Sequence, residues 1–234
     1  MMIRRILLKV SGEALSNRDD VFDHNILSYF SQELLPLVAE GVEVGIVCGG
    51  GNIFRGLPAS RESSINRVAA DQIGMMATVL NGLMLRAALE EAGCPCDVYS
   101  SFAVGSILPT FDARNAIAQL QKKRVVIVSG GTGNPYFSTD TAGALRALEL
   151  QADYLVKATK VDGVFDRDPV HHPDAVKFST LSLQDALEKN LKVMDLTALA
   201  LCADNRLPVY VYNFFKSGEL RSFIAGAGSG TYVS

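Results

Sequence analysis

The chain has 234 residues, of which 48% are hydrophobic and 20% are charged, and its net charge at pH 7 is −3. This length and composition are typical of a globular protein with one large α/β domain or two small ones. The chain has no run of Lys or Arg, which argues against a nucleic-acid polymer as its partner.

The cysteines and histidines do not predict a disulfide framework or a zinc site. No Cys-x-x-Cys pair is present, which favours reduced thiols in a cytosolic protein. The four cysteines are Cys48, Cys94, Cys96 and Cys202. The three histidines are His24, His171 and His172, and their spacing does not match that of zinc ligands.

Two apolar segments bear on membrane association. The N-terminal segment MMIRRILLKV places its charges too close to a short apolar run for a signal peptide. The longest uncharged run, Gln72–Leu85, has 14 residues, and a helix that spans a bilayer needs roughly 20. The sequence therefore predicts a soluble, cytoplasmic protein with no membrane partner.

Strands and helices alternate through the first half of the chain. Apolar runs predict strands, and apolar residues at helical spacing predict helices. In chain order we expect strand Ile3–Val10, helix Asp23–Glu40, strand Val42–Cys48, helix Asn66–Ala92, strand Cys96–Ser101 and helix Asp112–Lys123.

The second half continues the alternation. We expect strand Val125–Ser129, a helix that begins near Thr139, strand Asp153–Ala158, helices Ser182–Lys189 and Asp195–Asn205, strand Pro208–Tyr212 and helix Gly218–Ile224. Gly226, Gly228 and Gly230 predict a turn before a terminal edge strand.

This alternation predicts an α/β protein with a mainly parallel, twisted sheet and helices on both faces, a three-layer αβα sandwich. We expect a single domain, residues 1–234, with two lobes that meet near Lys123. Ligands should bind beyond the carboxyl ends of the strands.

Three loops that follow predicted strands carry residues suited to phosphate. Lys9–Gly12 contains a lysine, Gly49–Arg55 contains three glycines and an arginine, and Ser129–Asp140 contains glycines, threonines and an aspartate. Glycines allow the backbone to approach a ligand closely, and helix N-termini bind anions. Phosphoryl transfer needs such amides and cations, usually with Mg²⁺. The chain lacks GxxxxGK[ST], and no GxGxxG follows its first strand, which argues against a Walker-type NTPase and a Rossmann dehydrogenase.

Each candidate residue also has a purely structural interpretation. Lys9 lies where a strand leaves the core, and Asp140 would be a favourable charge in the first turn of a helix. Asp195 would be the N-cap of its helix. Phe165 would belong to the core. Asp71 is unusual on a long apolar helix, which favours a function or a buried cap.

Five motifs in order give the chain a resemblance to a known family. They are KVSGEAL (9–15), GGGNIFRG (49–56), GTGNPYFSTDTA (131–142), KATKVDGVFDRDP (157–169) and KVMDLTA (192–198). Together they closely resemble the bacterial-type UMP kinases (uridylate kinases) of the amino acid kinase family. The resemblance implies an amino acid kinase-like fold and Mg²⁺-dependent, in-line transfer of the ATP γ-phosphoryl group to UMP in pyrimidine nucleotide biosynthesis. It also implies a homo-oligomer, typically a hexamer.

The resemblance also implies site residues. It gives catalytic roles to Lys9, Asp140 and Asp195. It places ATP against Lys9, Ser11, Gly12, Gly51, Arg55, Thr159, Phe165 and Asp168. It places UMP against Gly50, Asp71, Thr132, Gly133, Asn134, Pro135, Tyr136, Phe137, Ser138 and Thr139, with Asp71 on the ribose. The residues that contact the metal are left open.

Physical roles can be attached to these assignments. Lys9 would neutralise charge on the transferring phosphoryl group, and Arg55 would clamp a phosphate with several donors. Asp140 and Asp195 would hold the cations, orient Lys9 or contact Mg²⁺ through water. Because the UMP phosphate is already an anionic nucleophile at pH 7, direct transfer without a phosphoenzyme or a general base is expected.

Two rival functions remain open at this level. One is a kinase of the same fold that acts on a carboxylate or carbamate acceptor, which the match of Asp71 and GTGNPYFST to a nucleotide acceptor site argues against. The other is a nucleotide-binding sensor or storage protein without catalysis, which the retained Lys9, Arg55, Asp140 and Asp195 argue against.

One departure from the family concerns regulation. Family members often carry a glycine-rich run after SGEAL and an Arg followed by a His on the long helix, which belong to activation by GTP. Here Ser16–Asp20 lacks glycine, and Arg86 is retained but Glu90 stands in place of the His. We therefore expect a rate that does not depend on added GTP. A large stimulation by GTP in a steady-state assay would contradict this expectation.

Overall fold

The computed structural model describes residues 3–54, 65–189, 191 and 193–234. Within them one sheet is built from eight strands. These are β1 (Arg5–Val10), β2 (Glu43–Cys48), β3 (Cys96–Ser100), β4 (Val125–Ser129), β5 (Tyr154–Thr159), β6 (Thr180–Leu181), β7 (Val209–Asn213) and β8 (Thr231–Val233). The strand order is β3-β4-β2-β1-β5-β7-β8-β6, and the β7–β8 pair is antiparallel whereas the others are parallel.

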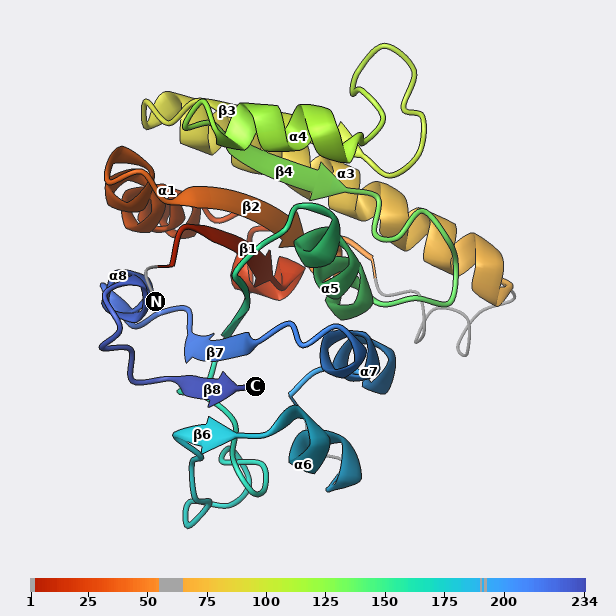
Figure 1. Ribbon diagram of the computed structural model, residues 1–234. Coiled ribbons are helices and arrows are strands. Elements are labelled where there is room, and N and C mark those ends of the chain that lie inside the picture. Colours follow the sequence, from red (N-terminus) through yellow and green to blue (C-terminus); the bar gives the residue numbers. More distant parts are fainter. Residues whose placement is uncertain (1–2, 55–64, 190, 192) are drawn as a thin grey trace.

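Helices cover both faces of this sheet, as predicted (Figure 1). One face carries α1 (His24–Ala39), α3 (Arg67–Glu91) and α8 (Glu219–Ile224), and the other carries α4 (Ala113–Leu120), α5 (Thr139–Glu149), α6 (Leu183–Glu188) and α7 (Leu196–Asp204). A short 3-10 helix, η1 (Gly12–Ala14), follows β1. Two separate apolar clusters, one on each face, form the core. The predicted three-layer fold is confirmed.

The alternation of side chains along β1 decides where its lysine lies. Ile6, Leu8 and Val10 belong to the cluster under α1 and α3, whereas Leu7 belongs to the opposite cluster under α5. Since side chains alternate with period two, Lys9 projects on the same face as Leu7. Its neighbour across the β1–β5 pair is Lys157. The register thus places two lysines side by side under the N-terminus of α5.

The predicted elements agree with the observed ones to within a few residues, with two differences at the end of the sheet. The terminal strand β8 was expected at the edge, but it lies between β7 and β6. The edge strand is β6, which has two residues. A strand this short carries no periodic pattern, so the sequence did not predict it.

The long apolar helix α3 is longer than its uncharged run. By length and composition it is the one helix of the described residues that could cross a membrane. In the fold it packs against α1, β3 and β4, and its Leu85 and Leu89 side chains are fully buried. α3 is therefore packed into the fold of the described residues.

A buried ion pair joins the first two strands at their amino ends. The Arg5 side chain donates to Glu43 Oε2 from Nε (2.6 Å) and to the Leu150 carbonyl from Nη1 (2.6 Å). Both charged side chains are buried. Removing one partner would leave the other charge buried without compensation.

We expect Glu43→Ala to lower the free energy of unfolding by about 3–5 kcal/mol, because it leaves the Arg5 guanidinium buried without its carboxylate partner. Glu40→Ala is the matched control, since Glu40 pairs with Arg221 on the surface and should cost about 1 kcal/mol or less. Urea unfolding of both variants measures the difference. Equal, small losses would contradict a structural role for the buried pair.

Candidate active site

One carboxylate holds two lysines at the carboxyl ends of β1 and β5. Lys9 Nζ lies 2.6 Å from Asp140 Oδ1, and Lys157 Nζ lies 2.8 Å from Asp140 Oδ2. Lys157 also donates to the Val193 carbonyl at 2.6 Å. The three charged side chains expose only 11%, 16% and 14% of their area for Lys9, Lys157 and Asp140. The cluster is thus largely shielded from water.

The charges of this cluster shift its pKa values. Burial raises the pKa of Asp140, but the Lys9 and Lys157 ammonium groups outweigh burial and bring this pKa down to about 2. Burial lowers the pKa of Lys157, and the Asp140 carboxylate opposes that shift. Asp140 is therefore ionised at neutral pH and fixes the orientation of both ammonium groups.

Asp195 connects two helix N-termini beside the lysines. Its Oδ1 accepts a hydrogen bond from Ala198 N (3.0 Å), which makes it the N-cap of α7. It also accepts hydrogen bonds from the hydroxyls of Thr141 (3.1 Å to Oδ1) and Ser138. Ser138 in turn caps α5 by accepting from the backbone N–H groups of Asp140 and Thr141. Two helix N-termini thus meet beside two cations, which suits an anion.

The structural interpretations of Asp140 and Asp195 are correct but incomplete. Asp140 lies in the first turn of α5, and Asp195 is an N-cap. Both also belong to the charged centre, because the helices they begin point at the lysines. The structural and the chemical interpretations therefore do not exclude each other.

The loops after β1 and β2 pack directly on one another. Gly49 N donates to the Val10 carbonyl at 2.8 Å. A Cβ on Gly12 would lie 2.3 Å from Asn52 Oδ1 and 2.8 Å from the Gly49 carbonyl oxygen, so a larger residue would push the loops apart. Gly51 follows in the same loop, and the Ser11 hydroxyl makes no capping hydrogen bond to η1. Arg55 lies outside the described residues.

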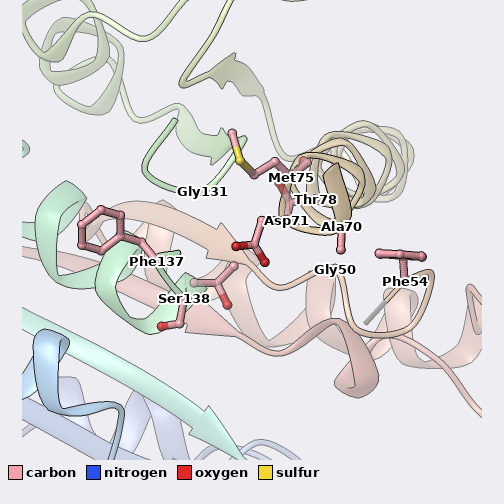
Figure 2. Close-up of a pocket in the computed structure, with 11 residues that line it drawn as sticks. Gly50, Phe54, Ala70, Asp71, Met75, Thr78, Gly131, Phe137 and Ser138 are labelled. Atoms are coloured by element: carbon pink, nitrogen blue, oxygen red, sulfur yellow. Dashed lines mark hydrogen bonds between the residues drawn. The ribbon is translucent and has the colours of Figure 1, made fainter. Parts of the chain in front are cut away.

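A pocket of about 160 Å³ lies between α3 and the loop after β4 (Figure 2). Five residues predicted to contact UMP line it: Gly50, Asp71, Phe137, Ser138 and Thr139. The sequence interpretation missed the others, which are Phe54, Ala70, Gly74, Met75, Thr78 and Gly131. The predicted residues Thr132, Gly133, Asn134, Pro135 and Tyr136 are not part of this lining.

Asp71 ties α3 to the glycine-rich loop. Its Oδ2 accepts hydrogen bonds from Tyr136 N (2.8 Å) and from Arg67 Nε (2.7 Å). Tyr136 has a φ of 72°, and the Arg67 guanidinium lies 5.2 Å from the centre of its ring. Figure 2 shows the Asp71 carboxylate pointing from α3 toward the side of the pocket where Ser138 lies. Tyr136 therefore contacts Asp71 through its backbone without lining the pocket.

A second pocket of about 340 Å³ lies between the segment after β5 and the residues that follow α6. It is lined by Val161, Gly163, Val164, Phe165, Asp166, Arg167, Asp168, Pro169, Lys189 and Leu191. Phe165 is half-buried and outside both core clusters, so its interpretation as a core residue is wrong. Thr159 is the last residue of β5 and precedes this segment, and its hydroxyl donates to the Val161 carbonyl at 2.7 Å.

Lys157 is the residue of the charged centre that sequence reasoning missed. A signal was present, because Lys157 stands on the predicted strand Asp153–Ala158, one residue before its end. Lys9 likewise stands one residue before the end of its own predicted strand. The sequence analysis did not pair these two strands with each other. Their parallel pairing in the structure places the two lysines next to each other.

The carboxylates of the centre do not form a ready metal site. Within the described ranges, no group of three or more His, Cys, Asp and Glu side chains is placed to hold a metal ion. Both oxygens of Asp140 are ion-paired with lysines, and those of Asp195 accept hydrogen bonds. Magnesium is commonly held by substrate phosphates and water with one or two carboxylates.

Comparisons with known proteins show which family this chain resembles. The model of the amino acid kinase family matches residues 4–213. The uridylate kinase of Actinobacillus succinogenes is 47% identical over 232 residues, which cover 99% of this chain and 98% of that protein. The uridylate kinase of Wolinella succinogenes is 49% identical over 223 residues, covering 95% and 92%. The crystal structure of UMP kinase from Bacillus anthracis superposes with a TM-score of 0.95 at 36% identity, covering 100% and 97%.

The depressed pKa of Asp140 predicts a pH-dependent contribution to stability. Because the pKa falls from 3.8 to about 2 on folding, the carboxylate stabilises the fold above pH 3.8, and this contribution is lost as the pH drops toward 2. We expect Asp140→Asn to have a lower melting temperature than the wild type at pH 7. The difference between the two melting temperatures, here called the gap, should narrow between pH 4 and pH 2. Thermal unfolding across this range measures the gap. A gap that stays constant would contradict the ion pairing.

Proposed function

Because the chain belongs to the amino acid kinase family, we propose that it is a UMP kinase, which transfers the γ-phosphoryl group of ATP to UMP and gives UDP and ADP. One observation carries this proposal: the pocket with Asp71 directly adjoins the lysine pair. Thr139 lines that pocket, and the next residue, Asp140, holds Lys9 and Lys157. An acceptor bound in the pocket would have its phosphate beside both cations.

The reaction needs charge neutralisation and positioning. Lys9 and Lys157 would bind the oxygens of the transferring phosphoryl group, while Asp140 keeps both ammonium groups aimed at it. The N-termini of α5 and α7, joined through Asp195, would add the positive ends of their helix dipoles to the charge of the lysines. The loss of one such preorganised donor typically costs 10²–10³-fold in rate, about 3–4 kcal/mol.

The acceptor is its own nucleophile. A phosphate monoester oxygen carries negative charge at pH 7, so the chain need not remove a proton from it. Both carboxylates of the centre are engaged with lysines or hydrogen-bond donors. This is expected of groups that position the lysines and helix N-termini rather than act as general bases. We propose direct in-line transfer without a phosphoenzyme.

ATP is assigned to the other side of the centre. Its phosphates would lie on Ser11, Gly12, Gly51 and Arg55, and its base and ribose in the second pocket, against Phe165 and Asp168. The aromatic ring of Phe165 offers an apolar surface to a base. In this assignment the chain is one domain, residues 1–234, with the acceptor mainly on the N-terminal lobe and ATP on the C-terminal lobe, and the lobes divide near Lys123.

UMP would bind against Gly50, Asp71 and the segment Thr132–Thr139. Asp71 is placed to accept hydrogen bonds from the ribose, since its carboxylate reaches the pocket and one oxygen is fixed by Arg67 and Tyr136. A carboxylate is a poor partner for another anion, which argues against a carboxylate or carbamate acceptor.

The remaining assignments follow the family. Mg²⁺ would accompany ATP, where it supplies charge neutralisation on the triphosphate. The protein would act in the cytoplasm in pyrimidine nucleotide biosynthesis. We further propose a homo-oligomer, a hexamer by resemblance, in which exposed apolar residues of α3, namely Val68, Ile73, Met76 and Leu80, are covered by another copy.

A coupled ADP-release assay with ATP, Mg²⁺ and a panel of acceptors tests the proposed function. We expect clear preference for UMP over CMP, dUMP, carbamate and acetylglutamate. Lys9→Ala, Lys157→Met and Asp195→Ala should each lower kcat by at least 10²-fold. Lys122→Met is the matched control, because Lys122 is exposed in the turn after α4 and its replacement should leave kcat unchanged.

Three outcomes would contradict this assignment in whole or in part. Turnover with carbamate or acetylglutamate instead of UMP would show another kinase of the same fold. Binding of ATP or UMP without turnover would show a sensor or storage protein. Trapping of a stable ³²P-labelled protein with ATP alone would exclude direct transfer.

A further inference from the structure

The second pocket is built on a loop that folds back on itself. Phe165 and Lys177 form a β-bridge between the two arms of the loop, and Phe178 N donates to the Val164 carbonyl at 2.9 Å. Val164 and Phe165 line the pocket. The shape of the pocket therefore depends on what holds these two arms together.

Thr231, far away in the sequence, is inserted between the two arms. Its hydroxyl accepts a hydrogen bond from Val164 N at 2.9 Å and donates one to the Phe178 carbonyl at 2.5 Å. The Thr231 side chain is fully buried. A single hydroxyl thus satisfies one backbone group on each arm, and no aliphatic side chain of the same shape can do so.

Two further contacts bind the same segments. Lys177 Nζ donates to the Ser229 carbonyl at 2.7 Å. Gly163 packs so closely that a Cβ there would lie 2.4 Å from Thr231 Oγ1. The residues Ser229, Gly230 and Thr231, here called the C-terminal clasp, therefore make four contacts with the loop, three through Thr231 and one through Ser229.

The clasp is itself fixed to the sheet and to α8. Thr231 pairs with Val211 in the antiparallel β7–β8 ladder. The buried Glu219 carboxylate accepts hydrogen bonds from the backbone and the hydroxyl of Ser229, and Tyr210 Oη accepts one from Gly230 N at 2.7 Å. The clasp is thus a rigid support for the loop.

We propose that Thr231 is a positioning residue for ATP, which sets the walls of the second pocket by holding Val164 and Phe178 at fixed distance. This inference rests on the assignment of ATP to that pocket. Thr231 does not touch the acceptor pocket, whose lining comes from other segments. Loss of the Thr231 hydroxyl should therefore raise the KM for ATP and leave the KM for UMP unchanged.

Steady-state kinetics of Thr231→Val and Thr231→Ser test the proposal. The valine variant keeps the shape but leaves Val164 N–H and the Phe178 carbonyl without their partner. We expect its KM for ATP to rise about tenfold, with KM for UMP and kcat at saturating ATP within twofold of the wild type. The serine variant keeps the hydroxyl and should retain a KM for ATP near that of the wild type. Thr180→Val, an exposed threonine on β6, is the matched control.

An unchanged KM for ATP in Thr231→Val would overturn the proposal. So would a parallel change in both KM values and kcat, which a general loss of structure would produce. If Thr231→Val does not fold, Lys177→Met gives the same readout, with an expected rise in KM for ATP of about threefold. No change in that variant would count against the clasp.

The proposal and the proposed function can fail separately. If the wild type does not phosphorylate UMP, the assigned function fails, and calorimetric titration of ATP into the wild type and Thr231→Val then decides the role of the clasp. Weaker ATP binding to the valine variant supports it. Equal binding, or no binding of ATP to either protein, overturns it.

Discussion

The shared carboxylate of Asp140 is the interaction on which the site depends. Two ammonium groups close enough to share one carboxylate would repel each other in a poorly hydrated environment, and burial alone lowers the pKa of Lys157. Asp140 offsets this cost by pairing with both. Its own position is set by α5, which Ser138 caps, and the lysines are set by the β1–β5 register. Sheet pairing and helix capping therefore assemble the charged centre before any ligand is bound.

The two pockets flank this centre in a way that suits a reaction between two anionic substrates. The pocket at Asp71 draws its walls from α3 and the loops after β2 and β4, whereas the pocket at Phe165 comes from the segment after β5. Both groups of loops leave the carboxyl ends of parallel strands in one sheet, where β2 and β5 lie on either side of β1. Ligands in the two pockets could therefore approach one point from opposite sides. In the proposed reaction, lysines at that point would reduce the repulsion between the two phosphates.

The sequence predicted the layers of the fold and part of this site, because these depend on local patterns. Apolar runs and glycine-rich turns marked β1, β2, β4 and β5. Lys9 and Asp140 stood in recognisable motifs, and Asp71 stood out as a charge on a long apolar helix. Lys157 and Thr231 were missed because their roles arise from pairing between distant strands. β6 was missed because a strand of two residues is too short to show an alternation of apolar and polar side chains. The lining residues Met75 and Thr78 were missed because apolar and small residues on a helix carry no chemical signal until the helix is placed.

Several residues serve both the fold and the site, and this has a physical cause. An N-cap such as Asp195 must place its oxygen at the first turn of a helix, where unpaired N–H groups and the positive end of the dipole also attract anions. A glycine such as Gly12 lets two backbones approach, and the amides exposed there are the same groups that surround a phosphate. In a parallel α/β sheet, strands end where the next helices begin, so capping groups, close-packed glycines and strand-end lysines gather at one edge. The constraints that form the fold thus bring together the groups that phosphoryl transfer requires.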